Sequence, residues 1–186
     1  MAGHFSGQCY AWGVVNEIFN EDGTFRSSVF YDVLGEDFVR IAFEAAREAD
    51  PTAKLYINDY NIDQADYPKT TGLVGKVQEW IAAGVPIDGI GTQSHLSTGA
   101  TGTQPLLELL AGAAPEVAIT ELDIGGGTAA DYQQVTDACL AVEACVGITE
   151  WGVTDAQSWR AGEAATLFND DFSPKEAYTS LVASLQ

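Results

Sequence analysis

Short apolar runs alternate along the chain with longer segments in which apolar residues recur at helical spacing. Short apolar, β-branched runs bounded by turn residues are typical of buried strands of a parallel sheet. We expect such strands at residues 11–17, 54–58, 87–92, 117–124 and 147–151. The pattern therefore predicts a strand roughly every 30 residues, with room for a helix after each one.

The segments between the expected strands predict amphipathic helices. The first is expected over residues 35–49, with Phe38, Ile41 and three alanines on its apolar face. The second runs its apolar face from Leu73 to Ile81 and ends at Gly84. Further helices are expected from Pro105 onward, over residues 132–142, and after residues 173–176, whose Ser-Pro-Lys-Glu sequence predicts a capping box with Pro at the first helical position.

Five strand-then-helix units with short connections predict an α/β protein with a parallel sheet. Two architectures compete, an open doubly wound sheet and a (β/α)8 barrel. No glycine-rich dinucleotide turn follows the first strand, which favours the barrel. A complete barrel needs eight units and about 250 residues. The 186 residues therefore predict a single domain over 1–186 that is a partial barrel.

Two of the expected strands carry a glutamate: Glu17 ends the first, and Glu121 lies inside the apolar run of residues 117–124. A carboxylate inside or beside an apolar strand must be paired or used, because burying a bare charge is costly. Since parallel strands end at the same rim, the two side chains are expected to face one another. A pair of carboxylates is what glycosidases use for catalysis. The alternative is that both are ordinary polar residues at strand ends.

Composition narrows the range of partners. The formal charge is −19, from eight Lys plus Arg against 27 Asp plus Glu, so nucleic acids and anionic membranes should be repelled. No apolar run approaches the length of about 20 residues needed to span a bilayer. Residues 1–10 lack the features of a signal peptide, so we expect a cytosolic chain or an export signal outside it.

The cysteines and the potential metal ligands bear on whether the chain holds a disulfide or a metal ion. Cys139 and Cys145 could close a disulfide loop, which would imply an oxidising compartment, or remain two buried thiols. Cys9 is expected to be a buried free thiol. No pair of potential ligands has the close spacing of a metal site, so neither a metal nor any other cofactor is expected.

Five motifs, taken together and in this order, resemble those of the family-10 glycoside hydrolases, the endo-β-1,4-xylanases, and their fungal members in particular. They are WGVVNE at 12–17, LYINDYN at 55–61, GTQSH at 91–95, ITELD at 119–123 and ITEWGV at 148–153. The family usually has W-D-V-V-N-E at the first motif, so Gly13 departs from the pattern. The resemblance implies strands 4 to 8 of the barrel, as the carboxyl-terminal portion of a catalytic domain shortened at its amino end.

The resemblance also implies roles. Glu17 matches the general acid/base, Glu121 the nucleophile, and Asn16 the residue that binds the sugar 2-hydroxyl. His95 matches the residue that holds the nucleophile, with Asp123 behind it. Sugar-contacting positions match Asn58, Tyr60 and Gln93, the aromatic walls of the cleft match Trp151 and Trp159, and the family disulfide matches Cys139 and Cys145. Xylan or a xylo-oligosaccharide is the implied partner, and secretion the implied localisation.

Chemistry adds two expectations. Apolar neighbours should raise the pKa of Glu17 by desolvation, which suits a proton donor, whereas hydrogen bonds should keep Glu121 ionised. Retention at the anomeric carbon requires the two carboxyl groups to lie about 5 to 5.5 Å apart, and we expect that separation.

Two alternatives to an active retaining xylanase remain. The chain could be an inactive fragment that binds polysaccharide through Trp151, Trp159 and Tyr60. It could also associate with itself, because a partial barrel leaves two open sheet edges, expected at residues 12–16 and 147–151.

Overall fold

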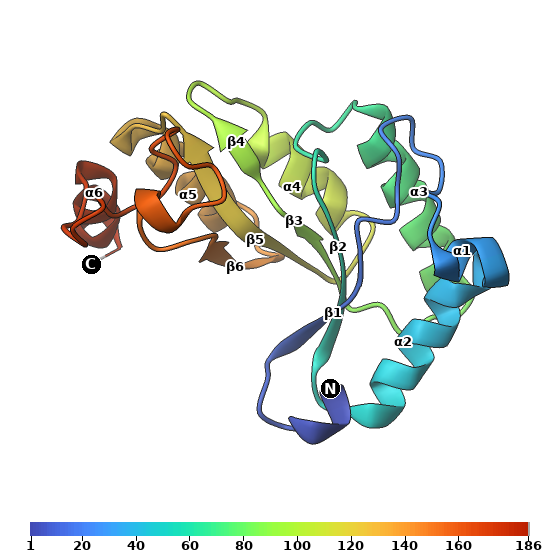
Figure 1. Cartoon of the computed structure of the whole chain (residues 1–186). Helices are drawn as coiled ribbons and strands as arrows, with labels where there is room; N and C mark the ends of the chain where they lie inside the picture. The colour runs from blue at the N-terminus through green and yellow to red at the C-terminus, as the bar shows by residue number, and fades with distance from the viewer. Residues whose placement is uncertain (186) are drawn as a thin grey trace.

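The computed structural model describes residues 1–185, and it confirms the alternation of strands and helices (Figure 1). The strands are β1 (Ala11–Asn16), β2 (Lys54–Asp59), β3 (Gly89–Thr92), β4 (His95–Ser97), β5 (Glu116–Gly125) and β6 (Cys145–Glu150). The α-helices are α1 (Val29–Leu34), α2 (Asp37–Ala49), α3 (Pro68–Ala82), α4 (Thr103–Ala111), α5 (Ala129–Ala141) and α6 (Glu176–Ser184). Short 3₁₀ turns, η1 (Ala2–His4) and η2 (Asp155–Gln157), complete the list.

All described strand pairs are parallel, and the main sheet runs in the order β1-β2-β3-β5-β6. The short strand β4, which the sequence pattern did not predict, pairs with the second half of β5 through His95 and Asp123. The chain turns between β3 and β4 at Ser94, whose φ is 59°. This turn brings the residues that follow β3 directly alongside the carboxyl end of β5.

Helices α2, α3, α4 and α5 pack against one face of the sheet, whereas α1 contacts α2 and α6 contacts α5. In Figure 1, α3, α4 and α5 follow one another from right to left beside the strands. From β2, Leu55 and Ile57 are fully buried and belong to the same core as Leu73 and Val77 of α3. The predicted face of α3 is therefore confirmed, and α3 ends before Gly84, whose φ of 88° suits a residue without a side chain.

Two helix predictions need correction. In α2 the buried residues are Phe38, Val39 and Phe43, whereas Ile41 is 44% exposed, so the expected face was rotated. A separate helix, α1, precedes α2 and was not predicted. None of its six residues is fully buried and only Tyr31 packs against the core, so the segment has no clear apolar face.

The predicted capping box at residues 173–176 is wrong. The last helix begins at Glu176, Lys175 occupies the N-cap position, and no side chain caps it. The hydroxyl of Ser173 instead donates to Asp171 within the preceding turn. The side chain of Lys175 is engaged by Asp155 of η2. A capping box does occur at the start of α5, between Thr128 and Asp131.

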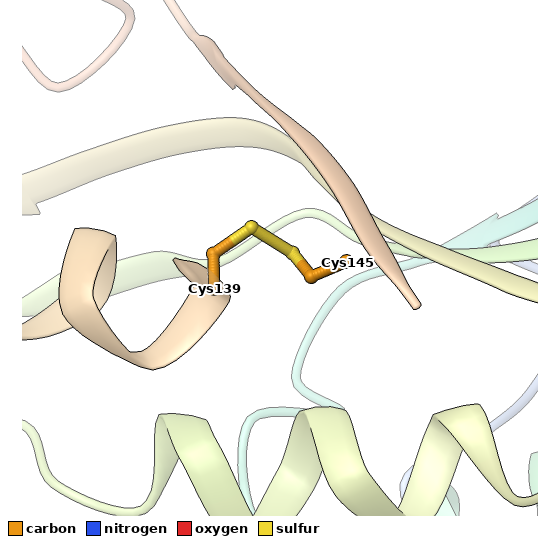
Figure 2. The surroundings of a disulfide bond; sticks show 2 residues. All are labelled: Cys139 and Cys145. Carbon is orange, nitrogen blue, oxygen red and sulfur yellow. A yellow bond between two sulfur atoms is a disulfide. The ribbon is translucent and has the colours of Figure 1, made fainter. Parts of the chain in front are cut away.

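The disulfide between Cys139 and Cys145 is present and joins α5 to β6, with 5.3 Å between the Cα atoms (Figure 2). Of the two possibilities left open by spacing, the structure confirms the bridge. Cys9 is a free thiol as expected, but it is partly exposed rather than buried.

The second face of the sheet lines a cavity of about 460 Å³ between β1 and β6. Trp12, Gly13, Tyr56 and Val146 are among its lining residues. Within residues 1–185, β1 pairs only with β2 and β6 only with β5, so the two predicted sheet edges are confirmed. A sheet with helices on one face and an open cavity on the other resembles the wall of a barrel more than a doubly wound sheet.

Candidate active site

The carboxyl ends of the strands bring the predicted residues to one rim. Asn16 ends β1 and Glu17 follows it with a φ of 58°, which turns the chain away at once. Asn58 lies in β2, Gln93 follows β3, and Glu121 lies in β5. The rim is therefore assembled from four strands that are far apart in sequence but adjacent in the sheet.

A cavity of about 520 Å³ opens at this rim. It is lined by Glu17, Tyr60, Asn61, Gln93, His95, Glu121, Trp151, Trp159 and Arg160. Asn16 and Asn58 line the neighbouring cavity inside the sheet, which Glu121 also borders. Among the predicted site residues, Asp123 lines neither cavity but lies directly behind His95, fully buried.

Three side-chain amides connect the two carboxylates. The Nε2 of Gln93 donates to Glu17 at 3.1 Å and to the Oδ1 of Asn16 at 3.3 Å. The Nδ2 of Asn58 donates to the same Asn16 oxygen at 2.9 Å and to Glu121 at 2.9 Å. The two glutamates thus belong to one continuous hydrogen-bond network across the rim.

Two neighbours fix the position of Asn58. The hydroxyl of Thr120 donates to the Oδ1 of Asn58 at 2.6 Å, which turns its Nδ2 toward Glu121. The absence of a side chain at Gly91 makes room, because a Cβ there would lie 2.5 Å from that Oδ1. The orientation of the amide is therefore set by β3 and β5, which lie on the same side of β2.

His95 joins Glu121 to Asp123. Its Nε2 lies 3.3 Å from Glu121 and its Nδ1 lies 3.0 Å from Asp123. Burial of the imidazole opposes its charged form, but the two carboxylates outweigh burial and raise the pKa of His95 above its usual value.

Asp123 is fully buried and is held by two further donors. Trp159 donates its indole N–H at 2.8 Å, and Arg160 donates to the other oxygen at 2.8 Å. Burial alone would raise the pKa of Asp123, but the contacts with His95, Arg160 and Trp159 lower it. The carboxylate is therefore stabilised in its charged form behind the imidazole.

The expected rise in the pKa of Glu17 is wrong. The hydrogen bond from Gln93 lowers the pKa of this carboxyl, burial opposes that effect, and Arg26 adds to it from 3.2 Å. The apolar neighbours of Glu17 in sequence do not surround its carboxyl group. Gln93, which follows β3, and Arg26, in the loop after β1, contact it instead.

Aromatic side chains border the cavity. Trp151 is 47% exposed and Trp159 is 64% exposed, so both present ring surface to solvent. Trp159 also contacts the edge of the His95 ring, with 5.0 Å between the centroids. Tyr60 contributes a third ring to the lining.

Several residues at or near the site were missed by sequence reasoning. Arg26 and Arg160 reach the site from loops, where no periodic signal marks them. Thr120 was hidden inside an apolar strand. Glu150 ends β6 just before Trp151, and the buried Oε2 of this carboxyl has no hydrogen-bond partner among the described residues.

Two further findings concern the described residues 1–185. No group of three or more His, Cys, Asp and Glu side chains is placed to hold a metal ion. No helix is both long enough and apolar enough to cross a membrane.

The chain is similar to known proteins along its whole length. The family model for glycosyl hydrolase family 10 matches residues 1–184. Endo-1,4-beta-xylanase 3 of Hypocrea jecorina is 58% identical over 188 residues, which cover 100% of this chain and 54% of that protein. Endo-1,4-beta-xylanase 2 of Claviceps purpurea is 52% identical over 98% of this chain and 57% of its own length. The chain thus spans about half the length of these curated relatives.

Solved structures show the same fold. Xylanase 10B from Thermotoga petrophila, crystallised in complex with xylobiose, matches with a TM-score of 0.91 at 32% identity. The match covers 99% of this chain and 62% of that one. The likeness confirms the expected part of a (β/α)8 barrel over the doubly wound alternative.

Proposed function

Because the chain belongs to glycosyl hydrolase family 10, we propose that it hydrolyses internal β-1,4-xylosidic bonds of xylan with retention of anomeric configuration. One observation carries this proposal. Glu17 and Glu121, from strands on opposite sides of β2 and β3, line one cavity and are linked through Gln93, Asn16 and Asn58. Such a pair of carboxylates is what a retaining glycosidase needs.

In the first step, Glu121 attacks the anomeric carbon and forms a covalent glycosyl-enzyme bond. The glycosidic C–O bond breaks, and Glu17 gives its proton to the departing oxygen. The contacts with His95 and Asn58 hold Glu121 in place. Because the raised pKa of His95 favours the imidazolium, this residue also stabilises the negative charge on Glu121 before attack.

In the second step, Glu17 removes a proton from water, and the oxygen of that water attacks the anomeric carbon. The bond to Glu121 breaks, which releases the sugar and restores both carboxyl groups. Since Gln93 and Arg26 lower the pKa of Glu17, its charged form is the one ready to act as this base. The first step instead needs protonated Glu17. Activity should therefore fall as pH rises above the pKa of Glu17.

The aromatic lining suits a sugar polymer. Trp151 and Trp159 present exposed ring surface beside the carboxylates, and Tyr60 adds a further ring. Flat aromatic surfaces can pack against the apolar faces of pyranose rings. We therefore assign xylan or a xylo-oligosaccharide as the substrate, in line with the names of the relatives.

The direct test measures reducing sugars released from xylan by the parent chain and by Glu121→Ala and Glu17→Ala. We expect activity in the parent and none above background in Glu121→Ala. With an aryl xylobioside, whose leaving group needs little protonation, azide should restore turnover to Glu17→Ala by replacing water in the second step. Equal rates for the parent and Glu121→Ala would contradict the proposal.

Retention has its own test. Proton NMR of early products should show the β-anomer first, followed by slow mutarotation. An initial α-anomer would require a different mechanism, with the carboxyl groups about 6.5 to 9.5 Å apart to admit water between them.

We further propose that the chain works outside the cell. The Cys139–Cys145 disulfide supports this, because such bonds persist in oxidising compartments. Detection of the protein in culture medium rather than in the cell extract would test it.

A second candidate is self-association of a chain that is itself inactive. It is favoured by the edges of β1 and β6, each paired on one side only within residues 1–185, and by the open cavity between them. Light scattering that shows a dimer, together with the absence of xylan hydrolysis, would support this candidate. An active monomer would exclude it.

A further inference from the structure

Lys69 stands out because its side chain is fully buried yet carries a charge. It lies in the first turn of α3, at 2.9 Å from Asp59 and 3.5 Å from Glu21. Its Nζ also lies 3.4 Å from the centroid of the Tyr60 ring, which is a close cation–π contact. Burying an ammonium group is costly, so such an arrangement calls for an explanation.

Asp59 connects the ammonium to the backbone that carries the aromatic ring. It ends β2, it is fully buried, and it accepts hydrogen bonds from the backbone N–H groups of Tyr60 and Phe19. One carboxylate therefore holds both the main chain of Tyr60 and the Nζ of Lys69. The ring and the ammonium are fixed relative to each other and to the sheet.

Glu21 ties the same group to the loop after β1. Its carboxylate accepts from the hydroxyl of Tyr67 at 2.9 Å, from the amide of Asn61 at 3.4 Å, and from Lys69. Asn61 has a φ of 52° and lines the cavity beside Tyr60. The loops after β1 and β2 thus share one ionic cluster, and the cavity wall lies directly on it.

We propose that Lys69 is a positioning residue that holds the Tyr60 ring as a fixed platform for a sugar unit of the substrate. The inference rests on the proposed function and adds a residue that does not touch substrate itself. Holding the ring before binding removes the entropy cost of ordering it, which improves affinity more than the chemical step. A solely structural Lys69 would instead serve only to neutralise Asp59.

The test measures xylohexaose binding by calorimetry in a Glu121→Ala background, where the ligand is not cleaved. We expect Lys69→Met to weaken binding about fivefold to thirtyfold, the range that corresponds to a desolvated cation–π contact. Lys76→Met is the matched control, because Lys76 lies on the same helix but pairs with Glu36 and Glu79. That control should bind like its parent.

A double-mutant cycle with Tyr60→Ala distinguishes positioning from general damage. If Lys69 acts through the ring, Lys69→Met should have little further effect on binding once Tyr60 is Ala. Fully additive losses, or a Lys69→Met protein that binds like Lys76→Met, would overturn the proposal. With the active enzyme, the change should appear mainly in KM and only weakly in kcat.

Removing Lys69 alone leaves Asp59 buried without its cation, which destabilises the fold of that variant. The double variant Asp59→Asn with Lys69→Met removes both charges, and thermal unfolding with circular dichroism shows which proteins are folded. The double-mutant cycle is then repeated in the Asp59→Asn background, with Lys69→Met and Tyr60→Ala as the two changes. The same result is expected. A parent protein that binds no xylohexaose would instead refute the proposed function, which separates the two failures.

Discussion

Replacing Glu150 with Gln should stabilise the protein at neutral and alkaline pH and leave it unchanged in acid. Burial, followed by the charge of Asp123 on β5, raises the pKa of Glu150 to about 8. Tyr132 of α5 also faces this carboxyl, and it donates its own hydroxyl to the backbone of Ala165. The buried Oε2 of Glu150 has no hydrogen-bond partner within residues 1–185, so nothing there compensates its charged form.

The sign and size of the effect follow from proton linkage. The unfolded carboxyl releases its proton near the ordinary pKa of 4.5, whereas the native state keeps it up to about pH 8. Between these values the native state binds more protons, so its stability is complete below 4.5 and is lost as pH rises toward 8. At about 1.4 kcal/mol per pH unit, the free energy of unfolding falls by about 3 kcal/mol at pH 7 and by about 5 kcal/mol above pH 8.

Urea or thermal unfolding of the parent, Glu150→Gln and Glu143→Gln from pH 4 to 9 measures the difference. Glu143 is exposed and comes seven residues earlier, so its variant controls for the lost formal charge. Near pH 7 the Tm of Glu150→Gln should exceed that of the parent by about 6 to 12 °C, given about 2 to 4 °C per kcal/mol for a chain of this size. The prediction would be contradicted by the same difference between parent and Glu150→Gln at every pH, or by an equal gain in Glu143→Gln.

Three further changes test other parts of the structure. Arg26→Gln should raise the pKa of Glu17 and move the alkaline limb of kcat/KM to higher pH, whereas Arg40→Gln on α2 should leave the pH profile unchanged. An alkaline limb that does not move in Arg26→Gln would count against the Arg26–Glu17 ion pair. Thr120→Val should lower kcat about tenfold by freeing the Asn58 amide, and Thr120→Ser, which keeps the hydroxyl, should not. Replacing both Cys139 and Cys145 with Ser should cost about 2 kcal/mol in urea unfolding, since the loop they close is short; dithiothreitol should have the same effect on the parent and none on the variant.

Much of the fold was predictable because most strands and helices carry strong periodic signals. The buried face of α3 and the edges at β1 and β6 follow directly from apolar patterning and from the order of elements. Strand β4 was missed because three residues are too few to show alternation. The capping box was wrong because the turn before α6 provides a nearer partner for Ser173 than a helix N–H.

The membership of the site was easier to predict than its electrostatics. Glu17 and Gln93 directly follow strands, and Glu121 lies within β5, so the strand pattern alone places all three in the sheet. The pKa of Glu17 depends instead on Arg26 and Gln93, which approach from other segments and carry no sequence signal for the contact. A neighbour in sequence was a poor guide to the neighbour in space.

The bend at Ser94 has a consequence for how the rim responds to disturbance. Gln93, on one side of the bend, holds Glu17, and His95, on the other side, contacts Glu121. The tripeptide Gln93-Ser94-His95 therefore contacts both carboxylates of the cavity. Its middle residue, Ser94, is buried and has left-handed backbone geometry. A bulky replacement at Ser94 would displace Glu17 and Glu121 at the same time. If these two carboxylates act as proposed, such a variant should lose all xylan hydrolysis rather than part of it.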